Sequence, residues 1–127
     1  MKQKFNKDWK GSKKPRKQRK YLANAPLHLK AKSVSSNLSE DLRKKYKKRS
    51  LTLRKGDKIK VMRGKFKGKE GKITQVMIKV SKVIIDGIQI KKKDGSKANL
   101  KMEPSNLQLV ELNLEDKKRL KRLTEKK

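Results

Sequence analysis

The chain has 127 residues, of which 41 are Lys or Arg and 12 are Asp or Glu, giving a formal net charge of +29. Repulsion at this charge opposes compaction, so we expect a polyanion to neutralise the folded protein. Only 31% of the residues are hydrophobic and 4% are aromatic, so the chain can bury one small core at most. Cysteine is absent, which excludes disulfides, thiolate metal sites and cysteine nucleophiles.

Three kinds of polyanion could neutralise this charge: nucleic acid, an anionic membrane surface or an acidic protein. The sequence has no apolar run near the ~20 residues of a membrane-spanning helix, and no broad amphipathic face or lipidation motif. Its charged start lacks the apolar region of a signal peptide. We therefore expect nucleic acid as the partner and no membrane insertion.

The first part of the chain is predicted to contribute little to a core. Residues 1–20 hold ten Lys or Arg and one acid, which is typical of a basic tail. Residues 21–53 are predicted to form an extended arm, because they show no clear period before a short helix at about 39–48. Ser39 is the expected N-cap of that helix, and Glu40 suits the positive end of its dipole.

From residue 54 the apolar residues alternate with polar ones, as in half-buried strands. Gly87 predicts a bulge, and Asp94-Gly95 predicts a hairpin turn. Short strands joined by glycine turns, with so few apolar residues, predict a mainly β fold with a small five-stranded barrel over residues 54–112. The expected strands are 58–61, 71–76, 83–90, 97–102 and 107–110.

The remaining segment, residues 113–127, is predicted to form a basic C-terminal helix at about 114–125. Asn113 is its expected cap, and early acids followed by later bases match the helix dipole. Leu120 and Leu123 would form a narrow apolar stripe on this helix.

Residues 54–73 resemble the KOW motif. The spacing G-D-x-V-x-V-x-x-G-x-x-K-G-x-x-G-x-V is met from Gly56 to Ile73, with Ile at two of the Val positions. Alternating branched residues would face the core, glycines permit positive φ in the turn, and the lysines of the turn would project towards phosphates. Transcription elongation factors and several ribosomal proteins share this motif, so it does not by itself choose between them.

The flanking segments narrow the choice. Residues 24–28, 35–46 and 103–107, with the closing basic helix, resemble the universal large-subunit ribosomal protein twenty-four family in its archaeal and eukaryotic form (eukaryotic number twenty-six). The resemblance runs from about residue 20 to 125. Gly56-Asp57 stands where eukaryotic members are expected to have Asp-Asp, which favours an archaeal-like source.

The resemblance implies an SH3-like barrel embedded in large-subunit rRNA near the polypeptide exit tunnel, with a role early in subunit assembly. Its partners would be this rRNA and neighbouring large-subunit ribosomal proteins, with no homo-oligomer and no cofactor. The expected location is the ribosome in the cytoplasm, with a nucleolar stage if the source is eukaryotic.

The expected RNA contacts are basic residues of the tail, the arm and the motif. By motif match the resemblance assigns RNA contact to Arg54, Lys55, Arg63, Lys65, Lys67 and Lys69. From the tail and the arm we add Lys13, Lys14, Arg16, Lys17, Arg19, Lys20, His28 and Arg49.

Three other side chains have alternative interpretations. Phe66, in the motif turn, could stack on a base or pack beside the turn. Trp9 lies in a segment with no core to join, which favours a contact with RNA or with another ribosomal protein. His28 has no Cys, His or acidic partner at metal-ligand spacing, so no metal site is expected.

An enzyme needs a nucleophile, a base or a metal in a pocket. A single His, no Cys and 12 acids scattered among lysines argue against one. Two other classes stay open from the residues alone. A KOW transcription factor would normally carry a second, acidic or mixed-charge domain, and a DNA-compacting protein would need a dimerisation surface.

Overall fold

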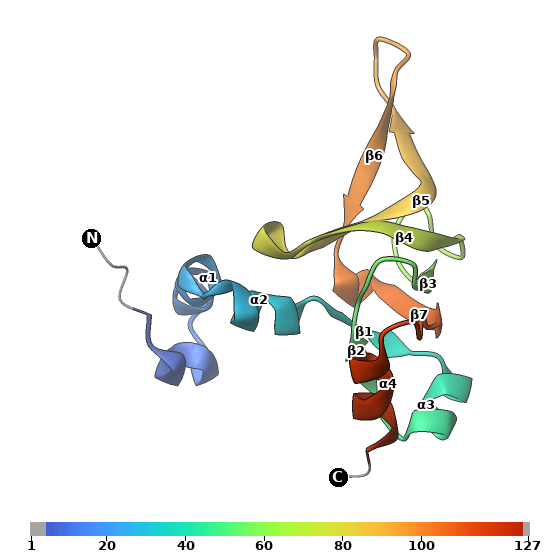
Figure 1. Cartoon of the computed structure of the whole chain (residues 1–127). Coiled ribbons are helices and arrows are strands. Elements are labelled where there is room, and N and C mark those ends of the chain that lie inside the picture. The colour runs from blue at the N-terminus through green and yellow to red at the C-terminus, as the bar shows by residue number, and fades with distance from the viewer. Residues whose placement is uncertain (1–4, 126–127) are drawn as a thin grey trace.

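The computed structural model describes residues 5–125 of the chain (Figure 1). Short helices and two small strands precede the predicted strands, and one helix follows them. In chain order the elements are η1 Lys7–Gly11, α1 Pro15–Asn24, α2 Leu27–Ser33, β1 Ser35–Leu38, α3 Glu40–Tyr46, β2 Ser50–Thr52, β3 Lys58–Val61, β4 Glu70–Met77, η2 Ile78–Val80, β5 Lys82–Lys91, β6 Lys97–Met102, η3 Pro104–Asn106, β7 Leu107–Glu111 and α4 Lys117–Thr124.

All seven strands belong to one sheet with the order β2-β1-β7-β3-β4-β5-β6. Neighbours pair antiparallel except β1 and β7, which run parallel with Leu38 opposite Leu109. The mainly β class is confirmed, but the closed five-stranded SH3-like barrel is not, because the sheet is open and has seven strands. Closure would require β6 to pair with β7, and β1 occupies that edge of β7 instead.

The five strands predicted beyond residue 54 are all present. The predicted irregularity in the third of them is confirmed, since the β5–β6 register shifts between Ile84 and Gln89, and Gly87 has a φ of +76°. The predicted hairpin turn is also confirmed. Asp94 accepts hydrogen bonds from the amide and the hydroxyl of Ser96, at 2.9 and 2.7 Å.

The prediction of an extended arm over residues 21–53 is wrong for its first part. The end of α1 and all of α2 lie in it, and β1 and β2 lie further along. Pro15 occupies the first turn of α1, where its fixed φ suits a helix. Pro26 ends α1 by holding Ala25 in extended backbone, and it is itself the N-cap residue of α2.

The helix predicted at 39–48 is present as α3, with Ser39 at the N-cap position, although its side chain makes no capping hydrogen bond. The C-terminal helix is shorter than predicted and starts at Lys117. Asp116 caps it by accepting from the amide of Lys118 at 2.9 Å. The predicted cap, Asn113, instead accepts from the amide of Glu115, which forms a local turn before the helix.

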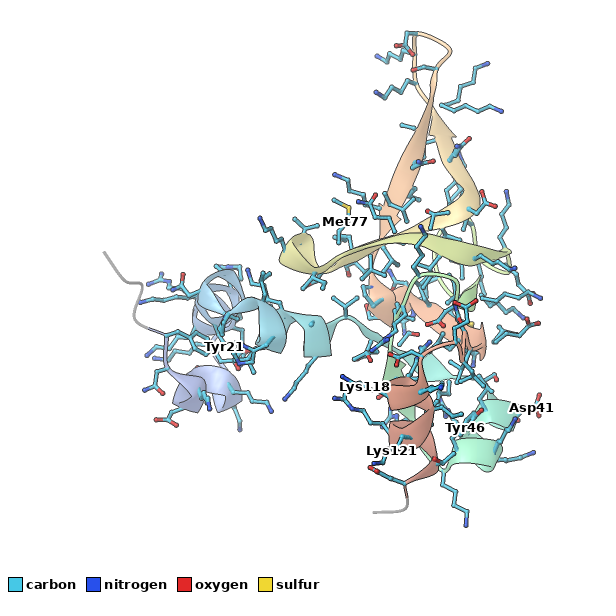
Figure 2. The ribbon with its side chains drawn as sticks, in the orientation of Figure 1. Tyr21, Asp41, Tyr46, Met77, Lys118 and Lys121 are labelled. Atoms are coloured by element: carbon cyan, nitrogen blue, oxygen red, sulfur yellow. The ribbon has the colours of Figure 1, made fainter. Side chains whose placement is uncertain are left out.

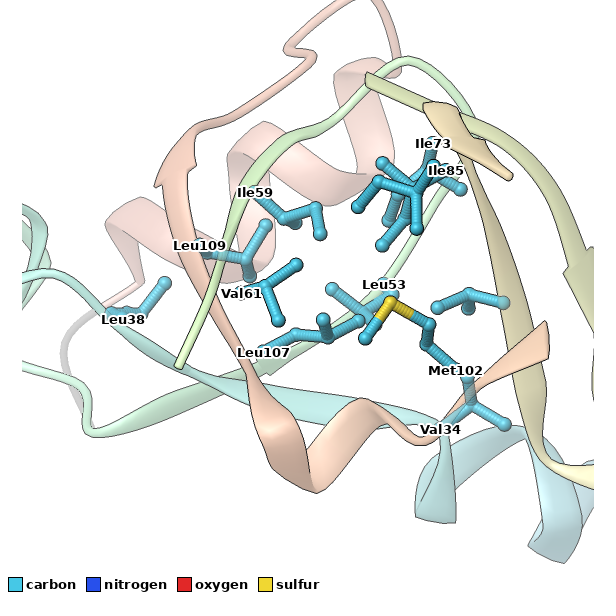
Figure 3. Close-up of a cluster of buried hydrophobic side chains, with 12 residues drawn as sticks. Val34, Leu38, Leu53, Ile59, Val61, Ile73, Ile85, Met102, Leu107 and Leu109 are labelled. Carbon is cyan, nitrogen blue, oxygen red and sulfur yellow. The ribbon is translucent and has the colours of Figure 1, made fainter. Parts of the chain in front are cut away.

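The core lies on one face of the curved sheet and is formed mainly by the inward-facing residues, every second one along a strand (Figure 3). Ile59 and Val61 of β3 pack there with Leu107 and Leu109 of β7, all fully buried. Met62, which directly follows β3, is 38% exposed and does not join this core. Other buried members are Val34, Leu38, Leu53, Ile73, Val83, Ile85, Ile88 and Met102.

Gly71 of the motif lies where β4 passes close to β5. A Cβ atom at this position would lie 2.6 Å from the backbone oxygen of Asp86 and 2.7 Å from the Cγ2 of Ile85. A backbone oxygen cannot move aside as a flexible side chain can, so the strands would have to separate. Gly71 is therefore required for the close approach of these strands.

We expect Gly71→Ala to lower the free energy of unfolding by about 1–3 kcal/mol, as overpacking of a well-packed site does. Urea unfolding followed by circular dichroism measures this difference. Gly11→Ala is the matched control, because nothing lies within 4 Å of a Cβ at that position. Equal stability of the two variants would contradict the steric interpretation of Gly71.

Candidate nucleic-acid interface

A buried ion pair joins the start of the motif to the C-terminal helix. Asp57 is fully buried and Arg119 of α4 is 4% exposed. The two Nη atoms of Arg119 donate to the two carboxylate oxygens of Asp57, at 2.6 and 2.7 Å. Such a bidentate geometry gives the strongest type of charge-assisted hydrogen bond between side chains.

The remaining hydrogen bonds of this pair tie together three separate parts of the chain. Asp57 also accepts from the backbone amides of Arg54 and Asn113, both at 2.9 Å. Arg119 also donates to the carbonyl oxygens of Asn113 at 2.9 Å and of Thr52, at the end of β2, at 3.1 Å. The pair therefore holds β2, the start of β3 and α4 together, and Arg119 also lines a groove between these elements.

This groove, which we call the cationic groove, is open to solvent and has a volume of about 920 Å³. It brings together three predicted RNA contacts, His28 from α2 and Arg54 and Lys55 from the motif. Three further basic residues that were not predicted, Lys32, Arg119 and Arg122, also line it. They lie on helices at opposite ends of the sequence, so no local pattern could have shown that they are neighbours.

The cations of the cationic groove differ in how strongly they are paired. Arg54 forms an ion pair with Asp116. The pKa of the Asp116 carboxyl is lowered, chiefly by the hydrogen bond from the Lys118 amide and further by Arg54. Within residues 5–125, Lys32, Lys55 and Arg122 form no ion pair, so their charges are available to an anion.

The motif turn, residues 62–69, lies at the other end of the β3–β4 pair from the cationic groove. Gly64 and Gly68 have φ values of +93° and +86°, so the turn requires the glycines that the motif places there. The amide of Gly68 donates to the oxygen of Val61 at 2.8 Å and closes the turn. Four predicted RNA contacts are exposed on it: Arg63, Lys65, Lys67 and Lys69.

Phe66 is only partly exposed and packs against the core cluster. The Nζ of Lys69 lies 5.1 Å from the centre of its ring. Of the two interpretations of Phe66, the structure therefore favours packing beside the turn, with the ring also holding a lysine by a cation–π contact.

The predicted contacts of the tail lie in and just before α1, away from the sheet (Figure 1). Lys17 is half-buried, whereas the other five are exposed. Arg49 is also exposed, just before β2, and its carbonyl oxygen accepts from the amide of Leu38 at 3.0 Å. The exposed residues of the tail are Lys13, Lys14, Arg16, Arg19 and Lys20. The expected contact of Trp9 concerns a side chain outside the described part of the chain.

Basic side chains thus occupy several faces of the molecule and not one patch. Figure 2 shows that α1, marked there by Tyr21, lies far from α4, which is marked by Lys118 and Lys121. The projecting β5–β6 hairpin adds exposed lysines that we did not predict as contacts, although the lysine run beside Asp94-Gly95 was a visible signal. These are Lys91, Lys92, Lys93, Lys97 and Lys101.

Within residues 5–125, no group of three or more His, Cys, Asp or Glu side chains could hold a metal ion. No helix in the same range combines the length and the apolar character needed to cross a membrane.

The protein has a small open sheet with a core on one face, and basic side chains on several sides of the molecule. These features define its class as a basic protein suited to a polyanionic partner. A family model that describes the eukaryotic ribosomal proteins L26 and their archaeal L24 counterparts matches residues 12–126. The chain is also 46% identical over 115 residues to the large ribosomal subunit protein uL24 of Methanosphaera stadtmanae, an alignment that covers 91% of this chain and 98% of that protein.

The chain therefore belongs to this family of eukaryotic and archaeal ribosomal proteins, which is not a family of enzymes. The family resemblance drawn from the motif and its flanks is confirmed.

The Asp57–Arg119 pair leads to a stability prediction. We expect Arg119→Met, which leaves a buried carboxylate without its partner, to lower the free energy of unfolding by about 3–5 kcal/mol. We expect Asp57→Asn to be similarly costly, and the double variant to cost clearly less than the sum of the two. Equilibrium unfolding in urea measures all three.

The exposed Lys58–Glu111 ion pair, with an N–O distance of 3.2 Å, provides the control. Glu111→Gln should change the free energy of unfolding by no more than about 1 kcal/mol, as is usual for surface pairs. Strictly additive losses in the double variant would mean that Asp57 and Arg119 contribute independently.

Proposed function

We propose that this chain is a structural constituent of the large ribosomal subunit and that it binds large-subunit rRNA through phosphate and shape contacts. The observation that carries the proposal is that exposed basic side chains gather on the motif turn and around the cationic groove, at two ends of one sheet, in a chain with a net charge of +29. Phosphate contacts position a protein on nucleic acid without reading its sequence.

The separation of these surfaces favours bridging between RNA segments over contact with a single one. The motif turn and the cationic groove lie at opposite ends of the β3–β4 pair, so one RNA strand cannot follow both without wrapping the protein. In this proposal each surface takes its own part of the folded rRNA. Release of counterions from those phosphates supplies most of the affinity.

The family resemblance supports the finer parts of the proposal. These are a role early in subunit assembly, a position near the polypeptide exit tunnel and contacts with neighbouring large-subunit proteins in the cytoplasmic ribosome. Early binding has a physical reason, because charge neutralisation favours both the compact protein and the close approach of RNA helices. The two alternative classes lose support, since the family match extends over residues 12–126 and so includes both basic extensions.

We expect the isolated protein to bind rRNA with an affinity that falls steeply with salt. A plot of log K against log salt concentration should be linear, with a slope that corresponds to several phosphate contacts. Filter binding or fluorescence anisotropy across about 50–200 mM salt gives this slope. An affinity indifferent to salt over that range would contradict the proposed mode of binding.

The motif turn can be tested by charge reversal. We expect Lys65, Lys67 and Lys69, all changed to Glu, to weaken rRNA binding and reduce the salt slope while the protein stays folded, because these side chains are exposed. Lys91, Lys92 and Lys93, all changed to Glu on the hairpin, are a control with the same change in net charge. A loss of the same size from both variants would show that affinity follows total charge and not the motif turn.

A further inference from the structure

We propose that a hollow beside α1 binds the base of an unpaired RNA nucleotide. This inference rests on the proposed function and names a chemical feature of the RNA that the chain takes. The hollow, which we call the aromatic pocket, has a volume of about 370 Å³, and its walls include Phe5, Asn6, Arg16, Lys20, Tyr21 and Asn24. This volume lies within the ~300–1,000 Å³ that is usual for small-ligand sites.

Two aromatic rings give the pocket its affinity for a flat, apolar group. The ring centres of Phe5 and Tyr21 are 5.0 Å apart and the rings are inclined by 49°, so neither ring covers the whole face of the other. Both side chains are half-buried. Proteins that take single-stranded RNA stack its bases on such rings, whereas paired bases are closed to them.

Polar side chains of α1 can bind the phosphates of a nucleotide and the edge of its base. Arg16, Lys20 and Asn24 are spaced four residues apart, so they share one face of the helix. Arg16 and Lys20 are exposed and form no ion pair with any residue between 5 and 125, so they are available to phosphates. The side-chain amide of Asn24 can both donate to and accept from the edge of a base.

The pocket is held by contacts that do not depend on RNA. The side-chain amide of Gln18 donates to the carbonyl oxygens of Lys10 and Ser12, at 2.9 and 2.6 Å, and so fixes η1 against α1. Figure 2 shows Tyr21 where these two helices come together. A site formed in advance binds with a smaller loss of conformational freedom. A purely structural role of the two rings, packing η1 against α1, would require neither an open pocket nor basic side chains at its edge.

The test distinguishes binding of the base from binding of the phosphates. Full-length protein is titrated with oligo-uridine RNA and with an abasic ribose-phosphate oligomer of the same length, which carries the same charge. We expect the wild-type chain to prefer oligo-uridine, and Tyr21→Leu to weaken that binding by about 5- to 150-fold without changing the salt slope. Tyr21→Phe, which keeps the ring, should retain the preference.

Tyr46→Leu on α3 is the matched control, because it removes the other tyrosine of the chain, and it should leave the preference intact. Photo-cross-linking with 5-iodouridine RNA should yield an adduct at Tyr21 or Phe5, which a merely structural role of the rings would not produce. Tight but equal binding of both oligomers by the wild type would overturn the aromatic pocket and leave RNA binding in place. Failure to bind either would overturn both proposals.

Discussion

The buried ion pair between Asp57 and Arg119 fixes the C-terminal helix to the start of the motif. It connects the end of β2, the start of β3 and the C-terminal helix through six hydrogen bonds, counting those to backbone groups. α4 buries only Arg119 and Leu123, so it has little other means of attachment. Without the pair, the cationic groove would lose the wall that α4 provides.

A buried ion pair is not in general the most stable way to fill a core, because desolvation of two charges offsets most of their attraction. In this protein the pair also satisfies two backbone amides and two carbonyl oxygens that apolar substitutes would leave unpaired. Its contribution therefore lies in fixing one arrangement of α4 against the sheet. Among the described residues, the Nε of Arg119 is the one guanidinium nitrogen without a hydrogen bond.

The extent to which the fold could be predicted depends on how local its signals are. The strands beyond residue 54 and the turn glycines follow from alternation and positive φ, which neighbouring residues determine. β1 and β2 have only four and three residues, and they become strands because β7 offers an edge to β1, which a local pattern cannot show. The edge taken by β1 is also the reason that the expected barrel stays open.

The residues of the candidate site also differ in whether local sequence signals predict them. The lysines of the motif turn follow from the motif, whereas the cationic groove depends on residues far apart in the sequence, such as Lys32 and Arg122. The sequence does contain a signal for the buried ion pair. Asp57 has the same parity as Ile59 and Val61, so an acid occupied an inward position of the strand pattern, and a buried acid needs a cationic partner. Which cation it pairs with depends on the path of the whole chain.

An open sheet exposes two edges, and unpaired edge strands invite association with other chains. β2 is very short, and β6 carries Lys97 and Lys101 along its length, both of which oppose pairing with a second copy. The same lysines that discourage self-association attract phosphates, so a single feature favours RNA as the partner over another copy of the chain. If the proposed function holds, the charge that limits the size of the core also opposes association of the open sheet with other copies before RNA is bound.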